Sequence, residues 1–435
     1  MIQADYALID GTLTRNVFIV VNDEGFITQI TQQARPATMN LPDRLLLPGF
    51  VNVHSHSFQR GLRGRGESFQ SGRGSFWSWR EAMYALVESF DCDQVRRLAR
   101  QAFGEMLDAG ITSVGEFHYL HHDDAEARDF AFDAAVLQAA RDVGIRIVLI
   151  LTYYETGGFG QPLSGGQRRF STPSVERFFE QVDQLATTLD PQLQSIGIAA
   201  HSIRAVPLLH LQALYEGAVR RKMVFHMHLE EQRKEIADCE QALGKRPMDA
   251  VLHALPEAKL TAVHATHTAA TTLEKLFARG GRVCMCPLTE ANLGDGIADV
   301  PAMNRQDGSI CLGTDSNARI SMLEEMRWLE YVQRLRHEQR GIVLDHNGEV
   351  GLRLLQIATA NGAAALGLPA GAIEEGRAAD FVSVNLSHPS LAACGDESIL
   401  NAVCLGMADD GIDATCVGGI WRKRANVAER VSIGE

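Results

Sequence analysis

The chain of 435 residues lacks the features that mark several classes of protein. It has no uninterrupted apolar run of about 18 residues, the length that a membrane-spanning helix requires. Its first residues, MIQADYALIDGTLTRN, lack the basic start and apolar segment of a secretory signal. Its eight cysteines are scattered and include no CxxC pair, as is usual for reduced thiols. We therefore expect a cytoplasmic protein without disulfide bonds.

A positively charged surface is also missing. The chain carries 41 lysines and arginines against 54 aspartates and glutamates, a formal net charge of −13, and it contains no long basic stretch. Such a surface repels nucleic acid and anionic membranes, so we expect neither as a partner. An acidic small molecule would bind only where arginines reverse the local field.

The sequence does contain a regular alternation of two kinds of segment. Eight short apolar segments rich in β-branched residues recur along the chain: LLPGFVNV, ITSVGEF, IRIVLILTYY, SIGIAAH, KMVFHMH, LTAVHAT, GRVCMCP and SICLGTDS. Runs of this kind are typical of strands covered on both faces. Longer segments with helical spacing, such as DQVRRLARQAFGEMLDAG, lie between most of them. Eight alternations predict an α/β fold, a (β/α)8 TIM-type barrel, with a doubly wound open sheet as the alternative.

Both ends of the chain fall outside this alternation. Residues 1–45 and 377–435 show short β-like bursts separated by turn signals, as in DYALIDGTLTRNVFIVV and ADFVSVNL. We predict that the two ends together form one small β-sandwich domain and that residues 46–376 form the barrel.

Histidines and an aspartate stand at the ends of several predicted strands. In such a barrel the catalytic groups lie at the C-terminal ends of the strands. His54 and His56 end the first segment, and residues two apart in a strand point to the same face. The fifth segment ends at His228, the sixth reaches His264, and the eighth contains Asp315. Three histidines and an aspartate at one rim are a plausible set of zinc ligands, although a single histidine is more often structural.

Two further groups at this rim fit proton transfer. Glu231 lies three residues after His228, where a carboxylate can stand beside a metal without binding it. Burial there would raise its pKa towards neutrality. The alternative for Glu231 is a solvated glutamate at a helix start, which is what we expect of Glu230. His264 is either a further ligand or a proton-transfer group.

With these motifs the chain resembles the amidohydrolase superfamily. The resemblance rests on PGFVNVHSH, FHMHLEE, VHATH and GTDS, and SFWSWREAMY, HSIRAV and LTEANLGDG are similar to the formiminoglutamate deiminase family within it. It implies a barrel with one Zn²⁺ per chain, a small β-sandwich and a homodimer. It also implies hydrolytic deamination of N-formimino-L-glutamate to N-formyl-L-glutamate and ammonia in histidine degradation, by attack of zinc-bound hydroxide on the formimino carbon.

The resemblance assigns roles to individual residues. It implies metal binding by His54, His56, His228 and Asp315, and catalysis by Glu231, His264 and Asp315. It implies substrate binding by Gln59, Arg80, Tyr119, His201 and Arg204.

Two positions depart from the family. Asn317 stands where we expect histidine, which puts substrate affinity in doubt, and Glu230 stands where we expect a small residue, with an effect on the surface alone.

A dicarboxylate substrate suits arginines at the rim of an acidic protein, because the guanidinium fork matches a carboxylate. Without the resemblance, Arg204 would be interpreted as half of a surface salt bridge and Tyr119 as a packing residue.

The segment 60–75, rich in Arg, Gly and Ser, is either a lid over the site or a solvated loop. Two other functions stay open: a deaminase of a purine or pterin ring, and a metal-free barrel that serves as a scaffold for protein contacts.

Overall fold

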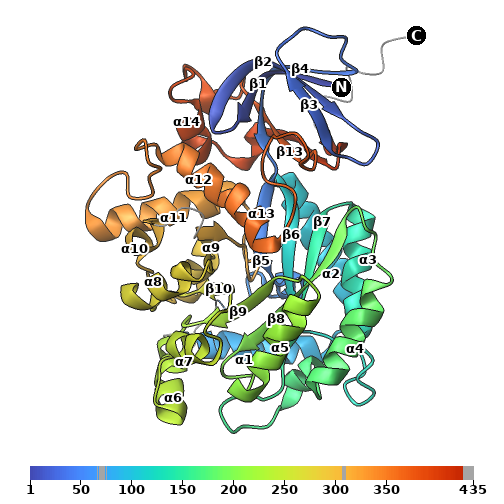
Figure 1. Ribbon diagram of the computed structural model, residues 1–435, viewed down its shortest axis with the longest axis vertical. Helices are drawn as coiled ribbons and strands as arrows, with labels where there is room; N and C mark the ends of the chain where they lie inside the picture. The colour runs from blue at the N-terminus through green and yellow to red at the C-terminus, as the bar shows by residue number, and fades with distance from the viewer. Residues whose placement is uncertain (66, 68–73, 75, 306–309, 425–435) are drawn as a thin grey trace.

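The computed structural model describes residues 1–65, 67, 74, 76–305 and 310–424. The chain forms two sheets, and the larger one is a parallel sheet of eight strands in chain order (Figure 1). Its strands are β5 (Phe50–Ser55), β6 (Ile111–His118), β7 (Arg146–Tyr153), β8 (Gln194–Ser202), β9 (Phe225–Leu229), β10 (Thr261–His264), β11 (Arg282–Met285) and β12 (Ile310–Leu312). All eight coincide with predicted segments.

The larger sheet closes into a barrel between its first and last strands. A bridge joins Ser55, at the end of β5, to Asp315, just after β12. The Asp315 N–H donates to the carbonyl of His54, and the His56 N–H donates to the carbonyl of Asp315, both at 2.9 Å. The predicted (β/α)8 barrel is therefore confirmed, and the open-sheet alternative is wrong. The seam lies among the candidate metal ligands.

Helices surround the barrel, which explains the nearly continuous apolar strands. Every residue of β6 and β7 is buried, because the barrel interior covers one face and helices cover the other. The helices are α1 (Phe76–Glu88), α2 (Cys92–Asp108), α3 (Ala131–Val143), α4 (Val175–Ala186), α5 (Leu208–Arg220), α6 (Arg233–Leu243), α7 (Pro247–Ala254), α8 (Ala270–Ala278), α9 (Pro287–Leu293), α10 (Val300–Asn304), α11 (Met322–His337), α12 (Val350–Ala358), α13 (Ala360–Leu366) and α14 (Ile399–Gly406). None of these helices is both long and apolar enough to cross a membrane.

The smaller sheet is built from both ends of the chain, as predicted. Its order is β15-β14-β13-β4-β1-β2-β3, and only the β1–β4 pair is parallel. Its strands are β1 (Ile2–Ile9), β2 (Thr12–Val21), β3 (Ile27–Thr31), β4 (Met39–Pro48), β13 (Phe381–Asn385), β14 (Ile412–Val417) and β15 (Ile420–Arg424). Antiparallel pairing of β4 with β13 joins the N-terminal and C-terminal contributions.

The smaller sheet lies against the N-terminal ends of the barrel strands (Figure 1). The chain passes from β4 into β5 at Gly49, whose N–H donates to the carbonyl of Asp380. The Asp380 carboxylate accepts two hydrogen bonds, at 2.9 and 3.0 Å, from Arg146, the first residue of β7. The opposite end of the barrel is left for the site. Division of the chain into domains after residues 45 and 376 stays a prediction.

Candidate active site

The four predicted metal ligands lie together at the C-terminal ends of the barrel strands. His54 Nε2 is 3.1 Å from Nε2 of His56 and 3.1 Å from Nε2 of His228. Asp315 Oδ1 is 3.4 Å from the His54 nitrogen and 3.2 Å from that of His56. All four side chains are buried, and their ligand atoms form one group within 4.8 Å. Three strands thus deliver four ligands to one point.

The hydrogen bonds behind these ligands fix which ring nitrogens carry protons. His56 Nδ1 lies 2.8 Å from the carbonyl of Phe117, and His228 Nδ1 lies 3.0 Å from the carbonyl of His201. A carbonyl only accepts, so each Nδ1 is protonated and, in the neutral ring, Nε2 presents its lone pair. Burial also lowers the pKa of His54 to about 3, which keeps that ring neutral. Lone pairs that face one another across 3.1 Å repel unless a cation lies between them.

This donor set fits a divalent metal ion. Three neutral imidazoles and one carboxylate match the ligand types of zinc, and separations of 3.1 to 3.4 Å suit atoms about 2 Å from a common centre. The pKa of Asp315 lies well below its usual range: burial opposes ionisation, but the imidazoles beside the carboxylate outweigh it. The carboxylate is therefore available as an anionic ligand.

Glu231 and His264 lie beside this group without joining it. His264 Nε2 is 3.8 Å from Glu231 Oε1 and 3.8 Å from Asp315 Oδ2. Its other nitrogen is 3.3 Å from Glu290 Oε1, on α9. Burial alone would lower the pKa of His264, but Glu231, the bond to Glu290 and Asp315 raise it to about 10. Burial raises the pKa of Glu231. A carboxyl group and an imidazole with shifted pKa values thus lie beside the four grouped residues, which is an arrangement suited to proton transfer.

Several residues of this rim have a left-handed backbone. The φ angles are +71° at His264, +48° at Ala265 and +48° at Asp315. Such angles cost a residue with a side chain about 1–3 kcal/mol each and concentrate at functional sites. Hydrogen bonds between neighbouring strands hold the strained backbone in place: the Asp315 N–H donates to the carbonyl of His54 across the seam, and the Ala265 N–H donates to the carbonyl of Leu229 at the end of β9.

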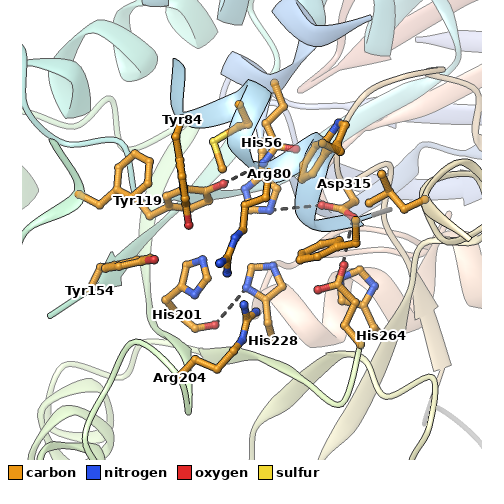
Figure 2. Close-up of a pocket in the computed structure, with 17 residues that line it drawn as sticks. His56, Arg80, Tyr84, Tyr119, Tyr154, His201, Arg204, His228, His264 and Asp315 are labelled. Carbon is orange, nitrogen blue, oxygen red and sulfur yellow. Dashed lines mark hydrogen bonds and ion pairs between the residues drawn. The ribbon is translucent and has the colours of Figure 1, made fainter. Parts of the chain in front are cut away.

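A pocket with an empty volume of about 530 Å³ opens above the ligands (Figure 2). All five predicted substrate residues line it, as do Glu231 and His264. Figure 2 shows the guanidinium groups of Arg80, from α1, and Arg204, from the segment after β8, directed into the same space. The pKa of His201 lies well below its usual range because of burial first, and then because of the positive charge of Arg204. Two guanidinium groups thus face this pocket of an acidic protein.

The remaining predicted substrate residues make contacts that orient them. Gln59 Nε2 donates to the Tyr119 hydroxyl at 2.8 Å, and Tyr119 meets the ring of His201 edge to face, with centroids 5.0 Å apart. Burial raises the pKa of Tyr119 well above its usual value, so the hydroxyl keeps its proton and remains a donor. Arg80 stacks over Trp77, with its guanidinium carbon 4.4 Å from the ring centroid. We infer from these contacts that the side chains are preorganised.

The two departures from the family are both buried residues. Asn317 is buried beneath the rim, where its side chain accepts from Thr314 Oγ1 at 2.7 Å and donates to Ser55 Oγ at 3.1 Å. It does not line the pocket. Glu230 was expected at the surface, but it is 1% exposed and accepts from the Met248 N–H at the start of α7 and from Arg246. The surface interpretation of Glu230 is wrong because this carboxylate anchors a helix.

Sequence reasoning missed several residues of the pocket. They are mainly aromatic or acidic: Phe76, Trp79, Tyr84, Tyr154 and Phe170 line it, Glu290 and Asp295 surround His264, and Gln167 donates to the Tyr84 and Tyr154 hydroxyls. The sequence itself offers a signal for three of these residues. Tyr154 closes the predicted strand IRIVLILTYY, and Glu290 and Asp295 belong to the motif LTEANLGDG.

A second buried histidine cluster lies outside the pocket. His118 Nε2 and His121 Nδ1 are 3.1 and 2.8 Å from Asp133 Oδ1, on α3. These are hydrogen-bond distances to one carboxylate oxygen. His121 Nε2 also lies 2.9 Å from the carbonyl of Thr152. The cluster ties the segment after β6, which carries Tyr119, to the helix layer.

Half of the predicted lid, residues 60–75, falls outside the described residues, which omit 66, 68–73 and 75. The start of the segment is tied down, because Arg60 and Arg63 pair with Glu105 on α2 at 2.7 and 2.8 Å. The choice between a lid and a solvated loop stays open.

Comparison with known proteins places this geometry in a family. The Amidohydrolase family model matches residues 45–421. A formimidoylglutamate deiminase of Pseudomonas aeruginosa is 35% identical over 97% of this chain and 94% of its own length. A 5-methylthioadenosine/S-adenosylhomocysteine deaminase of Shouchella clausii is 28% identical over 88% of this chain and 85% of its own.

Among solved structures, an amidohydrolase from Brucella melitensis superposes with a TM-score of 0.88 at 31% identity, covering 99% of this chain and 97% of the other. The matched region contains the barrel, the four grouped candidate ligands, Glu231 and His264. The family is metal-dependent, in agreement with the facing lone pairs of the histidine cluster. The chain belongs to the amidohydrolase family and is a hydrolase acting on carbon–nitrogen bonds.

Proposed function

We propose that the chain is a zinc-dependent formiminoglutamate deiminase, which hydrolyses N-formimino-L-glutamate to N-formyl-L-glutamate and ammonia in histidine degradation. One observation carries the proposal: two arginines, Arg80 and Arg204, are directed into the pocket above the metal ligands. A substrate with two carboxylates at one end and a hydrolysable C=N group at the other matches this polarity. The 35% identity to a formimidoylglutamate deiminase supports the same substrate.

The arginines account for binding and orientation. Arg204 is largely buried, and in such a site a guanidinium–carboxylate pair is stronger than at the surface. Its Nε is 3.8 Å from Glu235 and has no hydrogen-bond partner among the described residues. The contact with Glu235 therefore does not use the Nε–H donor of Arg204. With the carboxylates held by Arg80 and Arg204, the formimino carbon extends towards His228 and Asp315, which lie at the base of the pocket.

A divalent ion would be held by His54, His56, His228 and Asp315, and it would lower the pKa of a water molecule so that a nucleophile is available near neutral pH. Glu231 takes a proton from the attacking water as the water oxygen adds to the C=N carbon. The protonated His264 donates a hydrogen bond that stabilises charge developing at this centre. Glu231 then gives this proton to the terminal nitrogen of the tetrahedral carbon. It next takes the remaining proton of the new hydroxyl group and passes it to the same nitrogen. The C–N bond breaks, ammonia leaves, and the formyl C=O forms.

The alternative is deamination of a purine-like ring, and the aromatic lining of the pocket favours it. The chain is 28% identical to a deaminase of 5-methylthioadenosine and S-adenosylhomocysteine. However, the aromatic rings contact one another edge to face, as Tyr119 and Tyr154 do with Phe170 at 4.9 and 5.4 Å between centroids. Tyr119 and Tyr154 are stacked on one another, with ring centroids 6.3 Å apart, so these rings fill the space beside the arginines rather than framing a slot for a flat ring. We therefore prefer a flexible dicarboxylate over a flat ring.

Ammonia release tests the choice. The purified enzyme, loaded with zinc, would be assayed with N-formimino-L-glutamate, with adenosine-type nucleosides, and with guanine and a pterin. We expect turnover of formiminoglutamate with a kcat/KM at least about a hundredfold above that for any ring, since a missing carboxylate leaves buried arginines unpaired. A preference for a ring would refute the proposed substrate while leaving the family and the metal site intact.

A further inference from the structure

Glu235 is a buried carboxylate that the proposed chemistry leaves unused. It lies in the first turn of α6 and is 0% exposed. Neither of its oxygens has a hydrogen-bond partner among the described residues. Buried carboxylates without hydrogen bonds are costly, so such a group requires an explanation. Its nearest opposite charge is Arg204, whose Nε is 3.8 Å from Oε1.

A second buried glutamate shows what a purely structural pair looks like in this chain. Glu330, on α11, is also 0% exposed. It accepts from Arg334 Nε at 2.6 Å and from the N–H groups of Ile342 and Val343 at 3.1 and 2.7 Å. That pair is closed and fully bonded. The Arg204–Glu235 pair is open by comparison, close enough for strong attraction but without a hydrogen bond.

The open pair places Arg204 between Glu235 and the pocket in which the substrate carboxylate would bind. On one side is Glu235, and on the other is the pocket into which the guanidinium is directed (Figure 2). When a substrate carboxylate binds Arg204, two carboxylates share one guanidinium in a buried setting. Their mutual repulsion favours protonation of one of them. Glu235, whose charge is supported only by the Glu231 backbone and by the guanidinium 3.8 Å away, is the one that protonates most readily.

We propose that Glu235 is the resident counter-ion of Arg204 and that recognition of the substrate carboxylate is coupled to uptake of a proton by Glu235. The inference rests on the proposed dicarboxylate substrate and deepens it. Glu235 acts through Arg204 and is a positioning residue. It would balance the guanidinium in the empty site and become neutral when the substrate replaces it.

The groups around Glu235 favour this exchange. Arg204 faces it from the segment after β8, Glu230 and Glu231 from the end of β9, and Cys239 from α6 itself. Burial raises the pKa of Glu235 to about 7; Arg204 opposes this rise, while Glu231 and Glu230 add to it. The helix α7 packs on α6, but its Asp249 is engaged by Thr272 and Lys275. A small further rise in the pKa of Glu235 is therefore enough to protonate it near neutral pH.

The sign of the pH effect follows from the proton uptake. Below about pH 7 Glu235 is already neutral, and the substrate binds at no proton cost. Above that pH, binding must first draw a proton onto Glu235, so affinity falls and KM rises. If the substrate raises the pKa by about one unit, the affinity changes by about tenfold between the two limits. Glu235→Gln is neutral at every pH and should lose this contribution.

The test compares KM for N-formimino-L-glutamate from pH 6 to pH 8.5 in the zinc-loaded wild type, Glu235→Gln and the control Glu330→Gln. We expect the variant and the wild type to share one KM at pH 6. At pH 8.5 the KM of Glu235→Gln should be several-fold lower, with kcat changed less than about threefold. Glu330→Gln should lower the melting temperature and keep the wild-type pH profile. Parallel KM profiles for Glu235→Gln and the wild type, or a KM raised equally at every pH, would overturn the proposal.

A binding measurement separates this proposal from the substrate assignment. Calorimetric titration with N-formyl-L-glutamate at pH 7.5, in two buffers of different ionisation enthalpy, counts the protons taken up. The wild type should take up a fraction of a proton that Glu235→Gln lacks. Equal uptake by both would refute the role of Glu235 alone. If the wild type neither binds this ligand nor turns over formiminoglutamate, the dicarboxylate substrate itself fails, and the role of Glu235 fails with it.

Discussion

Replacement of Arg204 by alanine is the change that should most damage substrate recognition. The side chain is 11% exposed and is directed into the pocket, so its partner in the complex is a desolvated carboxylate. Truncating one member of a buried, hydrogen-bonded charge pair costs about 2–5 kcal/mol, which corresponds to a loss of about 30-fold to several-thousand-fold in kcat/KM. We expect most of the loss in KM, because the carboxylate does not take part in bond breaking.

The same substitution leaves Glu235 without its cation, and this determines what happens to the fold. The pKa of Glu235, about 7 in the wild type, should rise further once Arg204 no longer opposes burial. The residue is then neutral at pH 7, so no unpaired charge remains buried. We expect a melting temperature close to that of the wild type at pH 6 and a larger decrease at pH 8.5, where keeping Glu235 protonated costs more.

Ammonia release gives kcat and KM directly, and two variants serve as controls. Arg221 pairs with Asp183 at 2.6 Å on the outer side of the barrel, so Arg221→Ala should keep wild-type kinetics. Arg204→Lys should recover only part of the lost affinity, because an ammonium lacks the planar fork. A kcat/KM for Arg204→Ala within about threefold of the wild type would refute the assignment of Arg204 to the substrate, since a loss below about 0.7 kcal/mol is too small for a buried charge pair.

Three further predictions concern other parts of the site. Glu231→Gln should lower kcat by about 10²–10³ while metal content, measured by elemental analysis, stays unchanged, because Glu231 lies outside the group of four ligands. Asn317→Ala removes two buried hydrogen bonds and should lower the free energy of unfolding by about 1–3 kcal/mol in urea titrations, with KM unchanged within about twofold. Asp133 is ionised in the fold: burial opposes this, but His121 and His118 hold its pKa well below the usual value. Its contribution to stability is thus present above about pH 4 and is lost as the pH falls, so Asp133→Asn should lower the melting temperature at pH 7 and flatten its decline in acid.

The barrel was predictable because its signal is repeated. Eight mainly apolar segments at strand length, with helical segments between most of them, leave few alternatives, and β7, which is buried along its whole length, shows why such segments are rich in apolar residues. The four grouped ligands were predictable for a related reason. Each lies at or just after the C-terminal end of a strand, and these ends of the barrel strands meet at one rim.

Other features depend on contacts that no local pattern encodes. Glu230 has the sequence context of an exposed helix-start residue, yet its left-handed backbone, with φ of +54°, turns it inwards towards Met248. Asn317 sits beside the ligand Asp315 in sequence but bonds to Ser55, 262 residues away. Gln167 reaches Tyr84 and Tyr154 from a separate connection. Such contacts are set by how connections fold over the rim, and strand and helix periodicities say nothing about them. Formation of a homodimer stays a prediction.

Metal content is the most direct test of the central claim, that His54, His56, His228 and Asp315 hold one divalent ion at the mouth of the barrel. The purified chain would be reconstituted with zinc, freed of excess metal and subjected to elemental analysis beside His228→Ala. We predict about one ion per chain in the wild type and a clear loss in the variant, since structural and catalytic zinc sites need at least three protein ligands of good geometry. A wild-type protein that retains no metal, or a His228→Ala protein that retains as much as the wild type, would contradict the account.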